Sequence, residues 1–487
     1  MVAKYYDTLL WEYIKNPWVR WLSLDKLANK EFDYDMISYD EITNKKKLNF
    51  KDVDLESAAI YSWEDVYITN LLYTKHLKEK TTEDKILIDI EIPLIKVLQK
   101  MEIDWVFIEA DRLKWIWLLL ENEINRLEKS IFEEVEEEFN IKSPKQVWVI
   151  LFEKLTLPKW KKTKTWYSVN ADVLWELAHE YPIAQKIIDY RHYTKLQSTY
   201  IEWLLELIDN NWLVHTSYNV AVTATWRLSS TSPNLQNIPS SDWIAWEIRD
   251  AFISRFKWWR IIAIDYSQVE VRLLALMSWD GWLINAFKKW LDIHHKTAEF
   301  IFPWETITSS KRKIAKAVNF WVIYWISWFG LSKMIWISVK EANLYINKFY
   351  ESYPKVKEFL ENTIKSCEEK QYVETLFWRK RYIKWINDSN KIIKSSAERE
   401  AINMPIQWTS ADIIKLAMIK VYNFLKQWNY KSKLIMQVHD ELVFDTYPWE
   451  ETIIKKNIQN IMENILVNKK IKLKADIWEW KTWKEAK

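Results

Sequence analysis

KRKIAKAVNFWVIYWISWFGL, residues 311–331, is the stretch from which the fold and function of this chain are best inferred. As a helix, it places Arg312, Lys316, Phe320 and Tyr324 at successive i, i+4 steps, on one face that turns by about 40° per step. Cations can engage phosphates, and aromatic rings can stack on a base and pack against a sugar. The face therefore suits a nucleoside triphosphate. A helix with a solvated basic start and a core-facing aromatic end would show the same pattern.

Two acidic segments decide between these interpretations. DYSQVE at 265–270 follows the apolar run IIAI, so an expected strand ends in Asp265. QVHDE at 437–441 lies between LIM and LVF, which predicts a tight hairpin with Asp440 and Glu441 at its turn. If the two strands are neighbours, Asp265 and Asp440 can share two Mg²⁺ ions about 3.5–4 Å apart, which activate a 3′-hydroxyl and stabilise a leaving pyrophosphate. Either segment alone would also suit a solvated loop.

The motifs DYSQVEVRLLAL, RKIAKAVNFWVIYW and QVHDELVF resemble, in order and spacing, the polymerase motifs of bacterial family A DNA polymerases, the polymerase I type. Further matches are VTATWRLSSTSPNLQNIP at 222–239 and the segment 397–415, and the resemblance runs from about residue 83 to the C-terminus. It implies an α+β right-hand polymerase, in which a palm with a small antiparallel sheet carries helical fingers and a helical thumb. The implied parts are a thumb at 83–205, palm at 206–279 and 392–487, and fingers at 280–391.

The resemblance implies template-directed DNA synthesis in replication and repair, in which deoxynucleotides are added to a primer 3′-hydroxyl. Asp265 and Asp440 would hold two Mg²⁺ ions beside Glu441, and Lys316 would protonate the leaving pyrophosphate. The residues implied to bind the incoming nucleotide are Arg312, Lys316, Phe320, Tyr324, His294, Gln268 and Glu270. In the family, Glu270 fills the space that a ribose 2′-hydroxyl would need, and Phe320 in place of Tyr implies discrimination against dideoxynucleotides.

Primer-template DNA is the implied macromolecular partner. The residues implied to contact it are Arg227, Asn234, Gln236, Arg399, Asn403, Gln407 and His439, with Lys161, Lys162 and Lys164 in a basic thumb loop. Arg399, Asn403 and Gln407 recur at i, i+4, which suits a helix face that lines a groove. Lysines of the loop would hold phosphates, and minor-groove contacts would check base-pair geometry rather than identity.

Residues 1–82 resemble the end of a ribonuclease-H-like 3′–5′ exonuclease domain. Asp7, Tyr61 and Asp65 match its second and third motifs, whereas the first motif, an Asp-x-Glu on an opening strand, is absent. Hydrolysis by two metal ions needs that carboxylate pair. We therefore expect an incomplete exonuclease remnant and no proofreading by this chain; Asp7 and Asp65 as ordinary surface acids are the alternative.

Tryptophan stands where the family has glycine, at positions 226, 279, 321, 325, 378 and 408. The chain has 2 Gly and 34 Trp, and the two together make up about the share that glycine alone usually has. A chain of this length needs glycine for positive-φ turns and helix C-caps. Our hypothesis is that UGA codons read as Gly in the host were translated as Trp, with Trp259 and Trp483 as candidates for genuine Trp. A tryptophan-rich protein is the alternative.

Bulk composition is compatible with these expectations. A net charge of +3 does not by itself indicate nucleic-acid binding, but lysine and arginine cluster at 159–164, 311–316 and 379–384. Cys367 is the only cysteine, which excludes an intrachain disulfide. The sequence begins without a signal-peptide pattern, and its apolar runs are too short for a membrane span. We expect a monomer, cytoplasmic and associated with the bacterial nucleoid.

Two rival functions remain open at this stage. The first is a catalytically silent DNA-binding protein of the same fold, against which Asp265, Asp440, Lys316 and Arg312 argue. The second takes the tryptophans literally, as stacking platforms for single strands or sugars. It predicts tryptophan at exposed positions along a groove, whereas many stand at expected turns and close-packing sites.

Overall fold

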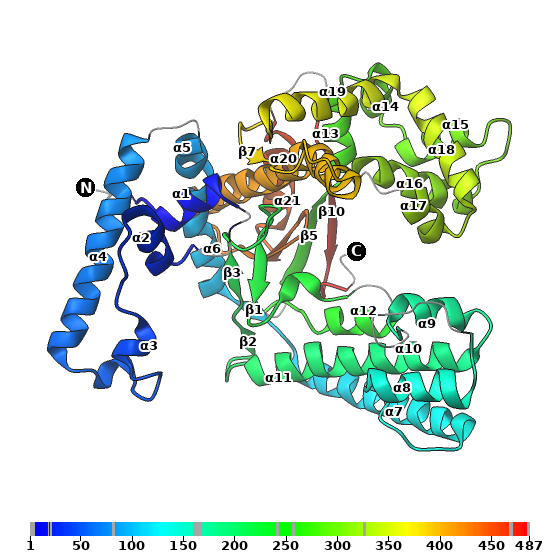
Figure 1. Cartoon of the computed structure of the whole chain (residues 1–487), viewed down its shortest axis with the longest axis horizontal. Helices are drawn as coiled ribbons and strands as arrows, with labels where there is room; N and C mark the ends of the chain where they lie inside the picture. Colours follow the sequence, from blue (N-terminus) through cyan, green and yellow to red (C-terminus); the bar gives the residue numbers. More distant parts are fainter. Residues whose placement is uncertain are drawn as a thin grey trace.

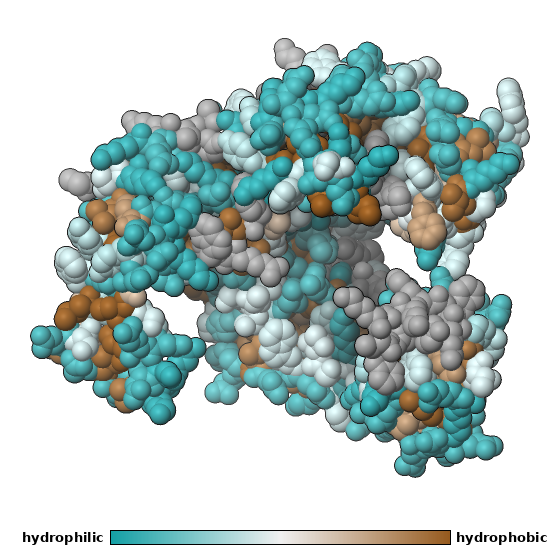
Figure 2. Space-filling view, in the orientation of Figure 1, coloured by the Kyte–Doolittle hydropathy of each residue, from teal (hydrophilic) through white to brown (hydrophobic). Residues whose placement is uncertain are grey.

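The computed structural model describes residues 5–17, 19, 22–79, 83–158, 168–239, 243–255, 259–324, 328–466 and 471–484. Figure 1 shows a central sheet with one helical lobe above it, a second below it and an arm of N-terminal helices at its side. Figure 2 shows an opening between the upper and lower lobes on the right of the same view. Within the described ranges, none of the helices combines the length and the apolar character that crossing a membrane requires.

The central sheet has four antiparallel strands in the order β10-β5-β9-β8. Their bounds are β5 Arg260–Tyr266, β8 Lys433–Val438, β9 Glu441–Thr446 and β10 Ala475–Trp480. Side chains alternate between the two faces of a strand. In β5, Ile262 and Ile264 enter one hydrophobic core and Ile261 and Ala263 enter the other. Because both faces are covered, the run 261–264 is apolar without interruption.

Three two-stranded sheets surround the central one. They pair β1 (Val106–Phe107) with β2 (Leu213–Val214), β3 (Ser217–Asn219) with β4 (Ser229–Thr231), and β6 (Tyr372–Glu374) with β7 (Lys380–Tyr382). The 37-residue helix α20 (Lys391–Gln427), with Pro405 inside it, shares a core with Ile262 and Ile264 of β5. α13 (Val269–Ser278) and α21 (Glu451–Glu463) cover the same core. The strands thus lie inside a shell of helices.

The lower lobe is built mainly from helices between residues 110 and 207, most of which lie in the range predicted as thumb, and that assignment stays a prediction. Its helices are α7 (Ala110–Val135), α8 (Pro144–Val149), η3 (Ile150–Lys154), α9 (Ala171–Ala178), α10 (Pro182–Lys195), η4 (Leu196–Glu202) and α11 (Trp203–Leu207), with α12 (Trp243–Asp250) against them. α7 buries Leu113, Ile116, Leu120, Ile124 and Leu127 among others, a spacing of three and four residues. This stripe packs against α10, so α7 is a long amphipathic helix.

The upper lobe is built from helices within residues 280–391, the range predicted as fingers, and that assignment stays a prediction. Its helices are α14 (Gly281–Lys288), α15 (Ile293–Ile301), α16 (Ser309–Tyr324), α17 (Trp328–Ile335), α18 (Val339–Ser352) and α19 (Pro354–Lys370). The continuous helix expected over 311–331 is described as two helices, α16 and α17, on either side of residues 325–327, which lie outside the described ranges. A 3.3 Å ion pair between Lys333 on α17 and Glu176 on α9 joins the two lobes.

In residues 5–79, as far as these are described, the regular secondary structure of the N-terminal arm is all helical. It contains α1 (Thr8–Lys15), α2 (Leu24–Phe32), α3 (Tyr39–Ile42), η1 (Phe50–Asp52) and α4 (Leu55–Lys78), followed by α5 (Glu83–Ile86), η2 (Leu87–Glu91) and α6 (Ile92–Asp104). Its assignment to an exonuclease remnant stays a prediction. α1 contacts the rest of the molecule through Tyr13, whose hydroxyl donates a hydrogen bond to the carbonyl of Thr223.

Candidate active site

The two predicted metal ligands lie on neighbouring segments of the central sheet. Asp265 is the last residue but one of β5, and its register partner on β9 is Glu441. The N–H of Tyr266 donates to the carbonyl oxygen of Asp440 at 3.2 Å, so the β8–β9 turn lies directly beside the end of β5. Asp265 and Asp440 are both half-buried. The predicted meeting of these two segments is therefore observed.

Glu441 has a different environment from the one expected at a turn. The turn consists of His439, with φ +55°, and Asp440, and Glu441 is the first residue of β9. Its side chain is 1 % exposed, and Oε1 accepts a hydrogen bond from Nε1 of Trp483 at 3.0 Å. The buried bond ties the C-terminal residues to the acidic turn.

α16 carries the predicted cations and rings on its exposed and half-buried positions. Arg312 and Lys316 are exposed, whereas Phe320 and Tyr324 are half-buried. The Lys316 Nζ lies 5.9 Å from the centre of the Phe320 ring, and the Phe320 and Tyr324 rings stack with centroids 6.4 Å apart. The structure thus brings together the four residues that the i, i+4 pattern had placed on one face.

Arg312 is held by a carboxylate that sequence reasoning left without a role. Its Nε donates to Oδ2 of Asp292 at 2.6 Å, and Oδ1 of Asp292 accepts from the N–H groups of His294 and His295 as the N-cap of α15. Burial alone would raise the pKa of Asp292, but the guanidinium and the two N–H groups hold it below its usual value. An Asp two residues before a functional His was the available signal.

His294 is buried at 3 % exposure beside α16. Its Nδ1 lies 2.8 Å from Nδ2 of Asn319, whose Oδ1 accepts from the Thr297 hydroxyl at 3.0 Å. Burial, helped by the charges of Arg312 and Lys316, lowers the pKa of His294 to about 4. The imidazole is therefore neutral near pH 7, and the amide donating to Nδ1 leaves the ring proton on Nε2. Asn319 was missed because nothing in its sequence context separates it from a core amide.

Glu270 links three segments of the site. Its Oε1 accepts from Nη2 of Arg227 at 2.9 Å, and its Oε2 accepts from the hydroxyl of Tyr324 at 2.9 Å. The carboxyl group is 5 % exposed, and burial, together with the charge of Asp440, raises its pKa. The charge of Asp440 also raises the pKa of Tyr324 beyond the effect of burial. Asp440, Glu270 and Tyr324 therefore belong to one electrostatic neighbourhood.

The predicted DNA contacts fall into three groups. Arg399 on α20 and His439 at the turn are exposed, and Asn403 and Gln407 on α20 are half-buried, with Nδ2 of Asn403 donating to the carbonyl of Tyr324 at 3.2 Å. Gln236 is buried and donates to Gln437 at 2.7 Å, while the side chain of Asn234 caps η5 (Leu235–Asn237). Lys161, Lys162 and Lys164 lie outside the described residues. Gln236 and Asn234 thus have hydrogen-bond partners within the protein that the sequence did not reveal.

The remaining predicted residues have local structural roles. Asp7 is the N-cap of α1 and accepts from the N–H of Leu10 at 2.9 Å. Tyr61 and Asp65 lie on α4, and burial followed by the charge of Glu64 raises the pKa of Asp65. Gln268 precedes α13 with φ +53°.

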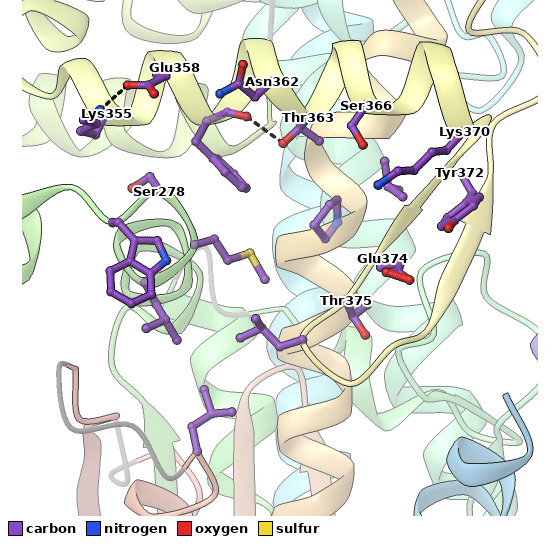
Figure 3. Close-up of a pocket in the computed structure, with 18 residues that line it drawn as sticks. Ser278, Lys355, Glu358, Asn362, Thr363, Ser366, Lys370, Tyr372, Glu374 and Thr375 are labelled. Atoms are coloured by element: carbon purple, nitrogen blue, oxygen red, sulfur yellow. Dashed lines mark hydrogen bonds and ion pairs between the residues drawn. The ribbon is translucent and has the colours of Figure 1, made fainter. Parts of the chain in front are cut away.

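A cavity of about 800 Å³ lies away from this site, between α13, α19 and the β6–β7 hairpin. Figure 3 shows Asn362, Thr363 and Ser366 of α19 along its upper wall and Glu374 and Thr375 of the hairpin at its side. None of the residues predicted to bind nucleotide, metal or DNA lines it. The candidate active site is therefore the open edge formed by β5, the β8–β9 turn and α16.

The chemistry of this edge fits Mg²⁺. Among the described residues no group of three or more His, Cys, Asp or Glu side chains forms a metal-binding cluster. Mg²⁺ in polymerase sites is bound by one or two carboxylates together with substrate phosphates and water. Asp265 and Asp440 are oxygen donors of that kind.

Comparison with known proteins identifies relatives of this chain. A family model described as DNA polymerase family A matches residues 110–485. DNA polymerase I of Bacillus subtilis is 42 % identical over 99 % of this chain and 55 % of its own length, and that of Caldicellulosiruptor bescii is 47 % identical over 82 % of this chain and 47 % of its own length. The chain thus spans about half the length of the curated relatives it matches.

The structure is similar to that of the POL domain of Pol1 from M. smegmatis in complex with DNA primer-template and dNTP. The TM-score is 0.88 at 29 % sequence identity, over 99 % of this chain and 82 % of that chain. The polymerase-domain fold expected from the sequence, mostly helical with small antiparallel sheets, is therefore confirmed.

Proposed function

This chain belongs to DNA polymerase family A, and we propose that it adds deoxynucleotides to the 3′-hydroxyl of a primer on a DNA template, with release of pyrophosphate. The observation that supports the proposal is the contact between the end of β5, which carries Asp265, and the β8–β9 turn, where the carbonyl oxygen of Asp440 accepts from the N–H of Tyr266. The cations and rings of α16 complete a site for a triphosphate, a base and metal ions.

Asp265 and Asp440 would hold two Mg²⁺ ions, which supply activation of the 3′-hydroxyl and neutralisation of the leaving pyrophosphate. The residues of the chain do the rest. Arg312 and Lys316 bind phosphate oxygens, and Lys316 donates a proton to pyrophosphate. His294 is neutral, so it contributes a hydrogen bond from Nε2 and no charge. Phe320 and Tyr324 stack at the base and sugar.

Selection of the sugar is assigned to Glu270. Arg227 and Tyr324 hold its carboxylate on both oxygens, so the side chain cannot turn away without losing two hydrogen bonds. A fixed side chain excludes a 2′-hydroxyl by steric contact, and this favours deoxynucleotides. Because Arg227 pairs with Glu270 in this structure, its proposed contact with the primer terminus requires the guanidinium to be shared or moved.

Other parts of the proposal concern partners and organisation. The lower lobe, the upper lobe and the central sheet are taken as thumb, fingers and palm around primer-template DNA, with the chain acting as a monomer at the bacterial nucleoid. Residues 1–82 are taken as an exonuclease-like part without proofreading activity.

The recoding hypothesis gains support from backbone conformation. Among the described residues, 19 non-glycine residues have positive φ, and eight of them are Trp: Trp105, Trp212, Trp226, Trp279, Trp290, Trp304, Trp336 and Trp378. Trp makes up 34 of 487 residues, so by chance only about one of the 19 positive-φ residues would be Trp. Glycine adopts positive φ without strain, whereas other residues pay roughly 1–2 kcal/mol. We therefore propose that glycine is the native residue at these eight positions.

The environments of buried tryptophan side chains also support the recoding hypothesis. Trp226 and Trp408 are both 0 % exposed, and within the described residues neither indole N–H has a hydrogen-bond partner. A buried donor without a partner costs about 1–3 kcal/mol. Trp483 is equally buried, but its N–H donates to Glu441, as suits a genuine Trp. Mass spectrometry of the protein from its own host tests the hypothesis; Trp at the eight positive-φ positions would disprove it.

Primer extension tests the catalytic proposal. The chain with glycine restored at the eight positions should extend a primer with Mg²⁺, and Asp440→Asn should reduce the single-turnover rate by roughly 10²–10³-fold or more while primer-template binding persists. Asp476→Asn is the matched control, because Asp476 is the register partner of Asp265 on β10, on the other side of β5 from the β8–β9 turn, and pairs with Lys474 at 2.8 Å. If the glycine-restored chain with Asp440 intact binds DNA but does not extend the primer, the silent DNA-binding alternative is favoured.

A further inference from the structure

A second cavity, of about 690 Å³, lies at the end of the central sheet opposite the catalytic edge. α6, the C-terminal end of α20 and the start of β8 line it, together with Trp259 and Tyr447 beside the first pair of β5 and β9. That pair is Arg260 with Thr446, and the pair at the catalytic edge is Asp265 with Glu441. Five residues of strand, about 17 Å, separate the two ends, so the cavity is a separate site.

Positive charge dominates the cavity lining. Lys100, Lys426, Lys431 and Lys433 line it, with Asp104 as the one acidic lining residue among those described. Asp104 is 5 % exposed and pairs with Lys433 at 2.7 Å and with Lys100. Lys426 and Lys431 form no ion pair with a carboxylate in the described part of the chain. Two ammonium groups are thus available at the rim to bind an anion.

Aromatic rings lie beside these ammonium groups. The Lys431 Nζ lies 4.7 Å from the centre of the Tyr447 ring, which meets the Trp259 ring edge-on at 5.0 Å, and the Lys426 Nζ lies 5.8 Å from the Tyr422 ring. Tyr430 also lines the cavity, as do the apolar side chains of Val97, Met101, Leu425 and Leu434. The rings can stack on a flat ligand, and the volume is that of an ordinary small-molecule site.

We propose that this cavity binds a nucleoside phosphate, with the phosphate at Lys426 and Lys431 and the base against Tyr447 and Trp259. An acidic peptide would also satisfy the lysines. However, the combination of aromatic rings with the exposed Lys426 and Lys431 in the lining of one cavity matches a phosphate joined to a base more closely. The ligand is either a free nucleotide or the phosphorylated 5′ end of a nucleic-acid strand, because both present the same group.

The experiment must separate this site from the catalytic one. The full chain carrying Arg312→Ala and Lys316→Ala, which weaken the proposed catalytic triphosphate site, is titrated with fluorescently labelled ATP and with a six-nucleotide strand bearing a 5′-phosphate or a 5′-hydroxyl. The probe variant adds Lys426→Glu and Lys431→Glu. The matched control adds Lys456→Glu, an exposed lysine on α21 outside the cavity. Fluorescence anisotropy reports binding, and thermal melting verifies that each variant is folded.

We expect saturable one-to-one binding that the control retains and the probe variant weakens at least tenfold. Binding of labelled ATP indicates a free nucleotide, and a preference for the 5′-phosphate strand over the 5′-hydroxyl strand indicates a strand end. Lys426→Gln with Lys431→Gln, a milder change, should give an intermediate loss if the charge-reversed protein does not fold. Equal affinity in the probe and control variants, binding of an acidic peptide alone, or no saturable binding would overturn the proposal. Because catalysis is not measured, none of these outcomes depends on the proposed polymerase activity.

Discussion

Glu270 is the residue whose contacts give the sharpest prediction about specificity. Replacing it with Ala removes the carboxylate held by Arg227 and Tyr324 and opens space at the proposed 2′ position. A binding pocket usually discriminates between two substrates that differ by one small group by a factor of about 10–200. We therefore expect the preference for dCTP over CTP, measured as a ratio of kcat/KM, to fall by roughly that factor. Tyr324→Phe, which removes only one of the two hydrogen bonds, should give a smaller fall; an unchanged ratio in Glu270→Ala would contradict the assignment.

His294 gives a prediction about pH. Burial lowers its pKa to about 4 from an ordinary value of 6.5. Between these two values the unfolded chain binds a proton that the folded chain does not, so the stability contributed by the neutral ring is complete above pH 6.5 and is lost as pH falls toward 4. From pH 7 to pH 5 the loss is about 2 kcal/mol at most.

The measurement compares urea unfolding of the parent protein and His294→Gln at pH 7 and pH 5. The variant should lose less stability than the parent over this interval, because its amide does not titrate. His295→Gln, at the exposed next residue, is the control and should keep the parental difference. Equal pH dependence in the parent and His294→Gln would show that the ring is not held neutral.

Residue types and spacing were enough to predict the main side chains of the site but not their partners. The i, i+4 rule placed Arg312 and Lys316 on one face, since helical geometry is local. The Asn319 amide on His294 and the Gln437 carbonyl on Gln236 come from other elements, and no local pattern encodes them. Glu441 was expected at a turn, yet pairing with β5 draws it into the strand.

At the scale of elements, a buried ion network joins η2, the β6–β7 hairpin and α20. Arg379 donates to Glu91 at 2.7 Å and to Asp412 at 2.5 Å, and Lys415 pairs with Glu91 at 2.9 Å. All four side chains are 0 % exposed. Removing one partner from such a network leaves a buried charge uncompensated, which costs about 3–5 kcal/mol.

We accordingly expect Asp412→Asn to lower the free energy of unfolding by about 3–5 kcal/mol, measured from the midpoint of denaturant unfolding. Glu400→Gln is the matched control, because Glu400 pairs with Arg381 of the same hairpin at 3.4 Å but is 47 % exposed in its side chain. An exposed pair contributes about 0–1 kcal/mol. Similar losses in the two variants would show that the buried network does not anchor the hairpin.

Elements were predicted well where burial leaves a clear local pattern. The apolar run before Asp265 gave the correct strand, because a strand that is covered on both faces is apolar without interruption. Segment 434–444 gave the correct hairpin for the same reason. The network of Glu91, Arg379, Asp412 and Lys415 was not predicted, since it joins residues more than 280 positions apart in the case of Glu91 and Arg379.

At the scale of the whole molecule, the tryptophans conflict with stability. Eight positive-φ tryptophans at about 1–2 kcal/mol each amount to roughly the whole net stability of a typical domain, about 5–15 kcal/mol. The fold itself nevertheless follows from the apolar periodicity of strands and helices, which does not depend on these positions. The fold can therefore be inferred independently of the unusual Trp content. The backbone conformation at each Trp distinguishes positions that need glycine from positions that tolerate either residue.

This distinction can be tested with two triple variants of exposed residues. Trp279, Trp290 and Trp304 have φ of +56°, +54° and +68°, and Trp63, Trp115 and Trp175 lie inside α4, α7 and α9. Changing the first three to Gly relieves left-handed strain and should raise the free energy of unfolding by about 1 kcal/mol per site. Changing the second three to Gly should lower it by roughly 0.5–1 kcal/mol per site, because glycine is a poor helix former. Calorimetric melting should therefore move in opposite directions; if both triples stabilise or both destabilise the protein, backbone conformation is not what makes these positions glycine sites.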